Sequence, residues 1–138
     1  MQPGLKAVWH NFRGNLCADI DAASVKGEYV VESVSIPEEV KGDIGLVLTG
    51  YLEVPADGIY TFALLSDDGS TLKLDGELLG DNDGAHSPVE IIVQKALKAG
   101  LHPMEVRYFD CNGGVLQMEL VNDKGEKTVL PKEWLKHE

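Results

Sequence analysis

The sequence is poor in basic residues and in long apolar runs, and each shortage excludes a class of function. Its 12 Lys and Arg stand against 23 Asp and Glu, which gives 138 residues a formal net charge of −11. Such an acidic chain is unsuited to nucleic-acid phosphates and to anionic membrane surfaces. No stretch approaches the roughly 20 apolar residues that a membrane-spanning helix requires. We therefore expect no nucleic-acid partner and no membrane insertion.

Cysteine is also scarce. Cys17 and Cys111 are the two in the chain, so one disulfide is the most that it can form. A bridge would close a loop of about ninety residues and stabilise the fold. Two free thiols are the alternative, and the sequence leaves both open. No Cys and His spacing suggests a zinc site.

Motifs for catalysis are missing as well. The sequence contains no Gly-x-Ser-x-Gly, no phosphate-binding loop and no Cys–His constellation. Paired carboxylates occur in turn motifs alone, and His10, His102 and His137 show no acid, base or metal spacing. We predict that this chain by itself is not an enzyme.

What the sequence does contain is a series of short strands. In residues 44–54 apolar side chains recur at every second position, which is typical of a half-buried strand. Similar runs, separated by turn residues, occupy 59–65, 71–75, 77–80, 89–97, 104–109, 115–121 and 127–130. Residues 133–137 could form a short terminal turn of helix. This spacing predicts an all-β antiparallel sandwich or barrel, with residues 1–138 as a single domain.

The most informative stretch is residues 64–86, which read LLSDDGSTLKLDGELLGDNDGAH. Here the chain resembles the PA14 (protective-antigen) domain family. That family has a Gly-x-Tyr-x-Phe strand, then Ser-Asp-Asp-Gly, then a Leu-x-Leu-Asp-Gly hairpin and a polar loop with His. The resemblance covers about residues 4–121. The residues that carry it, in order, are Gly58, Tyr60, Phe62, Ser66, Asp67, Asp68, Gly69, Leu72, Leu74, Asp75, Gly76 and His86.

The resemblance implies a β-sandwich that is appended to or inserted in larger extracellular proteins. These include glycosidases such as β-glucosidases and β-N-acetylhexosaminidases, yeast adhesins and toxins. A secreted, periplasmic or cell-surface location is implied with it. In the adhesin branch, two adjacent aspartates joined by a cis peptide hold a calcium ion, which binds sugar hydroxyls.

Carried onto this sequence, the resemblance makes Asp67 and Asp68 calcium ligands, with Asp110 and Asn112 from the loop 110–114. Neighbouring side chains on a regular strand point to opposite faces, so sharing one ion requires an irregular backbone. Calcium takes six to eight oxygen ligands. The alternative is a turn whose carboxylates accept backbone N–H groups. The loop 110–114 also lacks the Trp of the adhesin pattern.

We therefore expect the loops 66–70, 81–88 and 110–114 to meet at one end of the sandwich. The predicted function is a carbohydrate-binding accessory module, with calcium as a possible cofactor and a glycan as ligand. Two alternatives stay open: a structural accessory domain that packs on the catalytic domain of a parent glycosidase, and a cell-surface adhesion or protein-interaction module. The predicted carbohydrate-binding residues are Asp67, Asp68, Asp110, Asn112 and His86.

Overall fold

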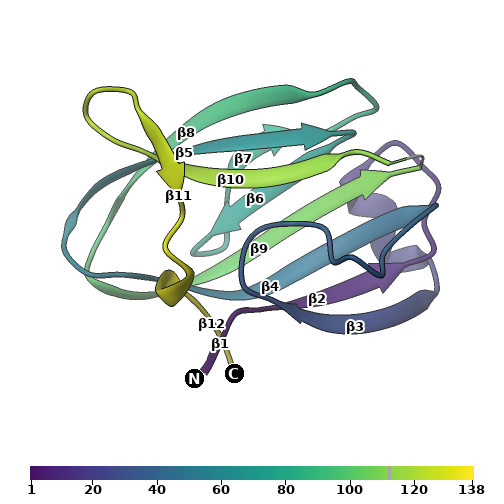
Figure 1. Ribbon diagram of the computed structural model, residues 1–138, viewed down its shortest axis with the longest axis horizontal. Coiled ribbons are helices and arrows are strands. Elements are labelled where there is room, and N and C mark those ends of the chain that lie inside the picture. The colour runs from purple at the N-terminus through teal and green to yellow at the C-terminus, as the bar shows by residue number, and fades with distance from the viewer. Residues whose placement is uncertain (112) are drawn as a thin grey trace.

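Two antiparallel β-sheets face each other and enclose one apolar core in the computed structural model (Figure 1), which describes residues 1–111 and 113–138. The predicted all-β sandwich is therefore confirmed. The larger sheet follows the order β1 (Gln2–Pro3), β12 (Leu135–His137), β4 (Ile44–Val54), β9 (Gly100–Asp110), β6 (Ser70–Leu74) and β7 (Glu77–Asn82). The smaller sheet follows the order β11 (Lys127–Val129), β10 (Val115–Val121), β5 (Gly58–Asp67) and β8 (Val89–Leu97).

Two further strands extend the larger sheet beyond β4. Strand β2 (Leu5–His10) pairs with the first half of β4, and β3 (Val25–Val31) pairs with β2. The second half of the same β4 edge pairs with β12. The two short 3₁₀ helices are η1 (Cys17–Ala22) and η2 (Lys132–Trp134).

The predicted strand bounds agree with the structure where alternation is strong. Strands β4, β8 and β10 begin and end at the predicted residues, whereas β5 and β9 are longer than predicted. The predicted terminal turn of helix over residues 133–137 is confirmed only as far as Trp134. Only a 3₁₀ turn forms there, and residues 135–137 become strand β12 because they find hydrogen-bond partners on β4 and β1.

The core lies between the sheets and is built by the inward-facing side chains, which alternate along each strand with outward-facing ones. Strand β4 pairs with β9 along its whole length, from Ile44 opposite Asp110 to Val54 opposite Gly100. Each fully buried large apolar side chain contributes about 1.5–3 kcal/mol relative to an exposed one. The largest of these side chains are Tyr108, Phe62, Leu5, Ile20, Leu46, Leu48, Leu52, Leu64, Leu72, Leu74, Leu135 and Val54.

A second apolar cluster forms on the outer face of the larger sheet. Phe12, Cys17 and Ile20, from the segment between β2 and β3, pack on Val47 and Phe109. The rings of Phe12 and Phe109 meet edge to face, with centroids 5.9 Å apart. This segment therefore covers the outer face beside the end of β9 that carries Asp110.

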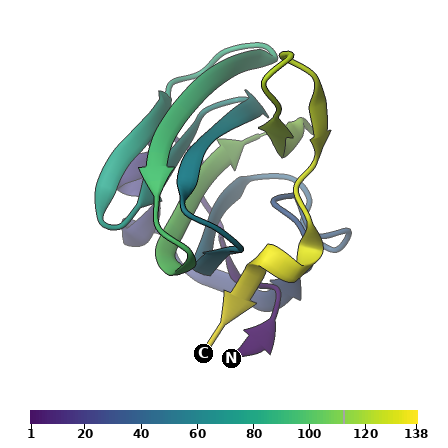
Figure 2. The same cartoon turned by 90° about the vertical axis from the view of Figure 1, so that its left-hand side faces the viewer.

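The two chain ends lie side by side, because β1 and β12 form an antiparallel pair (Figures 1 and 2). Trp134 fastens this region to the sandwich through an edge-to-face contact with Tyr60, at a centroid distance of 5.8 Å. The adjacent termini are thus a built part of the larger sheet.

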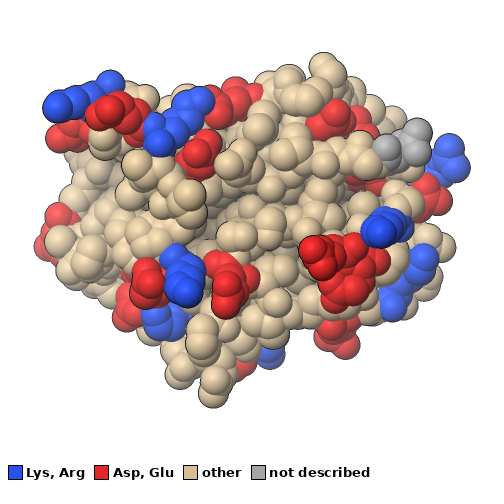
Figure 3. All heavy atoms as spheres, in the orientation of Figure 1, with Lys and Arg blue, Asp and Glu red and all other residues tan. Residues whose placement is uncertain are grey.

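Charged side chains are spread over the surface. On the face shown in Figure 3, Lys and Arg lie next to Asp and Glu toward the periphery, and the middle is largely uncharged. That face shows no extended basic patch. Within the described ranges, no helix has the length and apolar character needed to cross a bilayer.

Candidate functional site

Three carboxylates come together at one end of the sandwich. Asp67 is the last residue of β5, Asp68 follows it, and Asp110 is the last residue of β9. One oxygen from each lies within 4.8 Å of the other two. Because β5 and β9 belong to different sheets, this carboxylate cluster of Asp67, Asp68 and Asp110 spans the gap between them.

Two hydrogen bonds hold the backbone around the cluster in place. The peptide bond between Asp67 and Asp68 is cis. The carbonyl oxygen of Asp67 accepts a 2.6 Å hydrogen bond from the buried Tyr108 hydroxyl. The carbonyl of Gly69 accepts from the N–H of Phe109 at 3.0 Å. These contacts join the end of β5 directly to the end of β9.

Glycines allow the loops to approach this closely. A Cβ on Gly69 would lie 2.6 Å from the Phe109 ring and 2.7 Å from the backbone of Gly84, and one on Gly114 would collide with the Asp67 carbonyl. Distances below 3.0 Å leave no room for a side chain, so these positions require glycine. The loops expected to meet, 66–70, 81–88 and 110–114, do lie together, with Asn112 outside the described residues.

The loop 81–88 supports the cluster through His86. Its backbone N–H donates to Asp68 Oδ1 at 3.1 Å. Its ring nitrogens face two carbonyl oxygens, Nδ1 that of Ser87 at 2.7 Å and Nε2 that of Asn82 at 2.8 Å. Carbonyls only accept hydrogen bonds, so the doubly protonated imidazolium satisfies both contacts. The ring therefore fastens its own loop.

The electrostatics of the site agree with this arrangement. Burial lowers the pKa of His86, but the two carbonyl hydrogen bonds and the negative charge of Asp68 and Asp67 outweigh it, and the net pKa is raised. Burial, and then the negative charge of Asp110, Asp67 and Asp68, raise the pKa of Tyr108 well beyond its ordinary value. Tyr108 therefore stays a neutral donor to the Asp67 carbonyl.

A buried polar network lies beneath the turn 66–70. The Asn82 side-chain amide donates to Ser66 Oγ at 3.1 Å and to the Val89 carbonyl at 2.8 Å. Ser66 and Ser70 share a 2.7 Å hydrogen bond between their hydroxyls. Both serines are fully buried, and buried polar groups that are all paired fix a single geometry. This network therefore holds the turn from the core side.

The cluster fits the chemistry of a hard divalent cation. Calcium–oxygen distances of about 2.3–2.6 Å place two ligands of one ion at most about 4.6–5.2 Å apart. The separations within the carboxylate cluster lie inside that limit. Asp67 and Asp68 are half-buried and Asp110 is buried, so the first two leave an open side for further ligands.

A hollow of about 300 Å³ opens beside the cluster. It is lined by Phe12, Arg13, Gly14, Asn15, Asp68, Phe109, Asp110 and Cys111, and we call it the carboxylate-side hollow. The sequence reasoning missed the contribution of the loop 11–16. A polar, Gly-containing loop with one of the two arginines of an acidic chain was the available sign, but nothing local placed it near Asp110.

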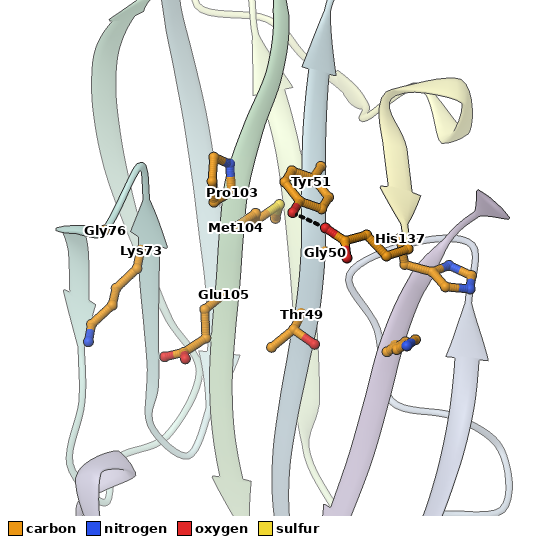
Figure 4. Close-up of a pocket in the computed structure, with 11 residues that line it drawn as sticks. Thr49, Gly50, Tyr51, Lys73, Gly76, Pro103, Met104, Glu105 and His137 are labelled. Atoms are coloured by element: carbon orange, nitrogen blue, oxygen red, sulfur yellow. Dashed lines mark hydrogen bonds between the residues drawn. The ribbon is translucent and has the colours of Figure 1, made fainter. Parts of the chain in front are cut away.

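A second hollow, of about 390 Å³, lies on the uncovered outer face of the larger sheet (Figure 4). We call it the outer-face hollow. Thr49 and Tyr51 of β4 and Glu105 of β9 line it, with Lys6 and Lys73 also contributing. The Tyr51 hydroxyl donates to Glu138 at 2.5 Å. Of the predicted site residues that the structure describes, Asp67, Asp68, His86 and Asp110, none lines this hollow.

Asp83, an acidic residue of the loop 81–88, lies outside the carboxylate cluster and holds the backbone of two neighbouring segments. Asp83 accepts hydrogen bonds from the N–H groups of Cys17 at 3.0 Å and Gly84 at 2.9 Å. It therefore ties the segment after loop 11–16 to the loop 81–88.

Both cysteines are free, Cys17 buried and Cys111 exposed at the carboxylate-side hollow. Of the two alternatives that the sequence left open, the structure therefore has two free thiols and no disulfide between them.

Solved structures with the same fold include binding domains and part of an enzyme. A PA14 sugar-binding domain from an RTX adhesin is 20% identical, with all of both chains covered and a TM-score of 0.81. The A domain of Candida glabrata epithelial adhesin 6, in complex with Galβ1-3GlcNAc, is 10% identical, with 99% of this chain and 88% of that chain covered and a TM-score of 0.74.

The GH31 α-xylosidase of Xanthomonas citri is 17% identical, with 89% of this chain but 14% of that chain covered, and its TM-score is 0.69. Comparison with curated protein sequences finds no significant match. The sequence model of the PA14 domain matches residues 1–134. With the two-sheet sandwich and the ordered motif already described, that match means that this chain belongs to the PA14 domain family.

Proposed function

We propose that this chain is a calcium-dependent carbohydrate-binding module that acts outside the cell or at its surface. The observation that carries the proposal is the carboxylate cluster, whose three oxygens lie within 4.8 Å of one another at the end of two sheets. The RTX adhesin domain of the same fold is a sugar-binding domain. Asp67, Asp68 and Asp110 would hold the ion, and Asn112 is proposed as a further ligand from the family resemblance.

The ion would supply the attraction for sugar hydroxyls, which replace water on its open side. The chain's own residues would set the geometry of that side. Tyr108 fixes the Asp67 backbone and the His86 N–H orients the Asp68 carboxylate. Since both ring nitrogens of His86 already face carbonyls, we assign His86 a positioning role and leave sugar contact to the ion and the hollow beside it.

Isothermal titration tests the proposal directly. The protein is titrated with calcium alone, and then with a glycan panel that includes Galβ1-3GlcNAc, in calcium and in a chelator. Binding is expected to be weak, because a shallow and wet site gains little per contact. Asp68→Asn should abolish calcium binding and glycan binding together. The matched control is Asp123→Asn, an exposed carboxylate in the turn before β11. A glycan that binds equally well in the chelator would refute the proposal.

A second candidate function has a specific observation in its favour. Val129, Ile92 and Ile59 are 77%, 55% and 70% exposed. The register places Val129, Glu119, Ala63 and Ile92 in one row across the smaller sheet, on its outer face. Exposed apolar side chains on one face suit a docking surface. The partner that would dock there is the catalytic domain of a parent glycosidase. Co-purification of that domain with wild type but not with Ile92→Ser would support this role.

A further inference from the structure

The carboxylate-side hollow has a rigid floor and a single cationic side chain on its rim. Phe12 and Phe109 are buried and meet edge to face, so the floor is fixed. Arg13 is exposed and is the one Lys or Arg among the eight residues that line the hollow, all of which the structure describes. Two carboxylates, of Asp68 and Asp110, and the side chain of Arg13 thus line the same hollow.

Arg13 makes no ion pair with any residue that the structure describes, and in this it differs from the other arginine. The other arginine, Arg107, pairs with Asp21 and with Glu105, each at 2.9 Å. Five of the six salt bridges in the described ranges engage a lysine or Arg107, the sixth engages His102, and none engages Arg13. Among the described residues, no ion pair engages the exposed Arg13 guanidinium.

The loop that carries Arg13 is anchored at both ends. Phe12, on one side, packs on Phe109 and donates its N–H to the His10 carbonyl at 2.8 Å. Cys17, on the other side, donates its N–H to Asp83. Gly14 packs against the Phe12 ring, where a Cβ would lie 2.5 Å from the ring carbon Cζ. The backbone between these anchors therefore presents Arg13 at the hollow at small entropic cost.

We infer that the carboxylate-side hollow selects saccharides that bear a carboxylate, namely hexuronic acids, and that Arg13 recognises that group. The inference rests on the proposed function, since the ring hydroxyls of the same sugar would be held by calcium. A guanidinium offers paired N–H donors that match the two oxygens of a carboxylate. A neutral hexose gives these donors no partner of that kind.

The charges explain why recognition of the acid requires the ion. The cluster has a formal charge of −3 from Asp67, Asp68 and Asp110, and this repels an anionic sugar. A bound calcium changes the sum to −3 + 2 = −1, and Arg13 brings it to zero. The acid is then attracted at the Arg13 side, and the repulsion by the cluster is much smaller. Selectivity for the acid should therefore appear with calcium and fall as salt screens the exposed pair.

The test compares two ligands that differ only at C6, methyl α-galactopyranoside and methyl α-galactopyranosiduronate. Their affinities are measured by titration calorimetry in saturating calcium. For wild type we expect the uronate to bind about two- to fivefold more tightly, the range for one exposed charge-assisted contact. Arg13→Gln should bring this ratio to about one. The control Lys6→Gln removes the same charge from the outer-face hollow and should keep the wild-type ratio.

The outcomes separate the two proposals. If calcium and the galactoside bind but the uronate gains nothing, or if its gain survives in Arg13→Gln, the inference about Arg13 is wrong while the proposed function stands. If calcium does not bind at all, the proposed function fails and the inference fails with it. A gain that is lost in Lys6→Gln as well would show a general charge effect and would overturn the assignment to Arg13.

Discussion

Replacing Asp68 by Asn should have opposite effects on stability with and without calcium. In a chelator, the carboxylates of the cluster repel one another, because one oxygen of each lies within 4.8 Å of the others. Coulomb's law at that separation gives about 1 kcal/mol per pair in a water-like medium, and more where the site is drier. Asp68 takes part in two of the three pairs. Asp68→Asn should therefore raise the apo free energy of unfolding by about 1–2 kcal/mol.

The substitution is chosen because it preserves the other contact of this side chain. An amide oxygen can still accept the N–H of His86, which now donates to Asp68 Oδ1 at 3.1 Å. The side chain keeps its shape, so the change removes charge alone. For a chain of this length, a gain of 1–2 kcal/mol corresponds to a rise in Tm of about 4–8 °C.

Calcium should reverse the order of the two proteins. At a hundredfold excess over Kd, a ligand that binds the native state alone stabilises it by about 2.7 kcal/mol, or roughly 10 °C here. Wild type should gain this and Asp68→Asn should not. Differential scanning fluorimetry in chelator and in calcium, with Asp123→Asn as control, measures all four states. An Asp68→Asn protein that is less stable in chelator, yet responds to calcium as wild type does, would refute this reasoning.

Three further predictions concern Tyr108, the two cysteines and His86. Tyr108→Phe removes the 2.6 Å hydrogen bond to the Asp67 carbonyl. It should cost about 1–3 kcal/mol in urea unfolding and about tenfold or more in calcium affinity by calorimetry, and unchanged calcium affinity would disprove its positioning role. Burial raises the pKa of the Cys17 thiol, so a maleimide should modify Cys111 alone in the native protein, as mass spectrometry of tryptic peptides can show. Because the pKa of His86 is raised on folding, its stabilisation is complete below about pH 6.5 and is lost as pH rises through the higher native value. Urea unfolding in chelator should show this decline for wild type and not for His86→Gln, and an NMR titration that places the native pKa below that of a model peptide would contradict it.

The sequence predicted most of the strands in which periodicity and burial agree. Strand β4 keeps its apolar side chains at every second position because that face meets the core along the whole strand. Strand β2 has the same alternation over six residues, at Leu5, Ala7 and Trp9, and was missed. Strand β3 is mostly exposed, and its alternation is weak, because Gly27 interrupts the apolar positions and Val30 lies on the exposed side. It is a strand because β2 pairs with it, and pairing between distant segments has no local sign.

The residues of the candidate site were also predictable only in part. Asp67 and Asp68 carry a recognisable motif, and Asp110 follows from the resemblance. What places Asp110 beside them is the pairing of Ser70 with Tyr108 and the hydrogen bonds from Tyr108 and Phe109 to the carbonyls of Asp67 and Gly69. Arg13 could not be predicted at all, because some hundred residues separate its loop from Cys111 and a packing contact between two phenylalanines brings them together. A motif of adjacent residues can be read from the sequence, whereas the distant residues that pack beside it are determined by the tertiary fold.

Strand β4 also separates the two chain ends from the carboxylate cluster. Its Ile44 end stands beside Asp110, and its Leu52 end pairs with Leu135, next to both chain ends. Eight residues of strand correspond to about 26 Å. Both chain ends thus lie at the pole remote from the carboxylates. A tag or a surface linker fused at either end would therefore leave the carboxylate cluster open to solvent.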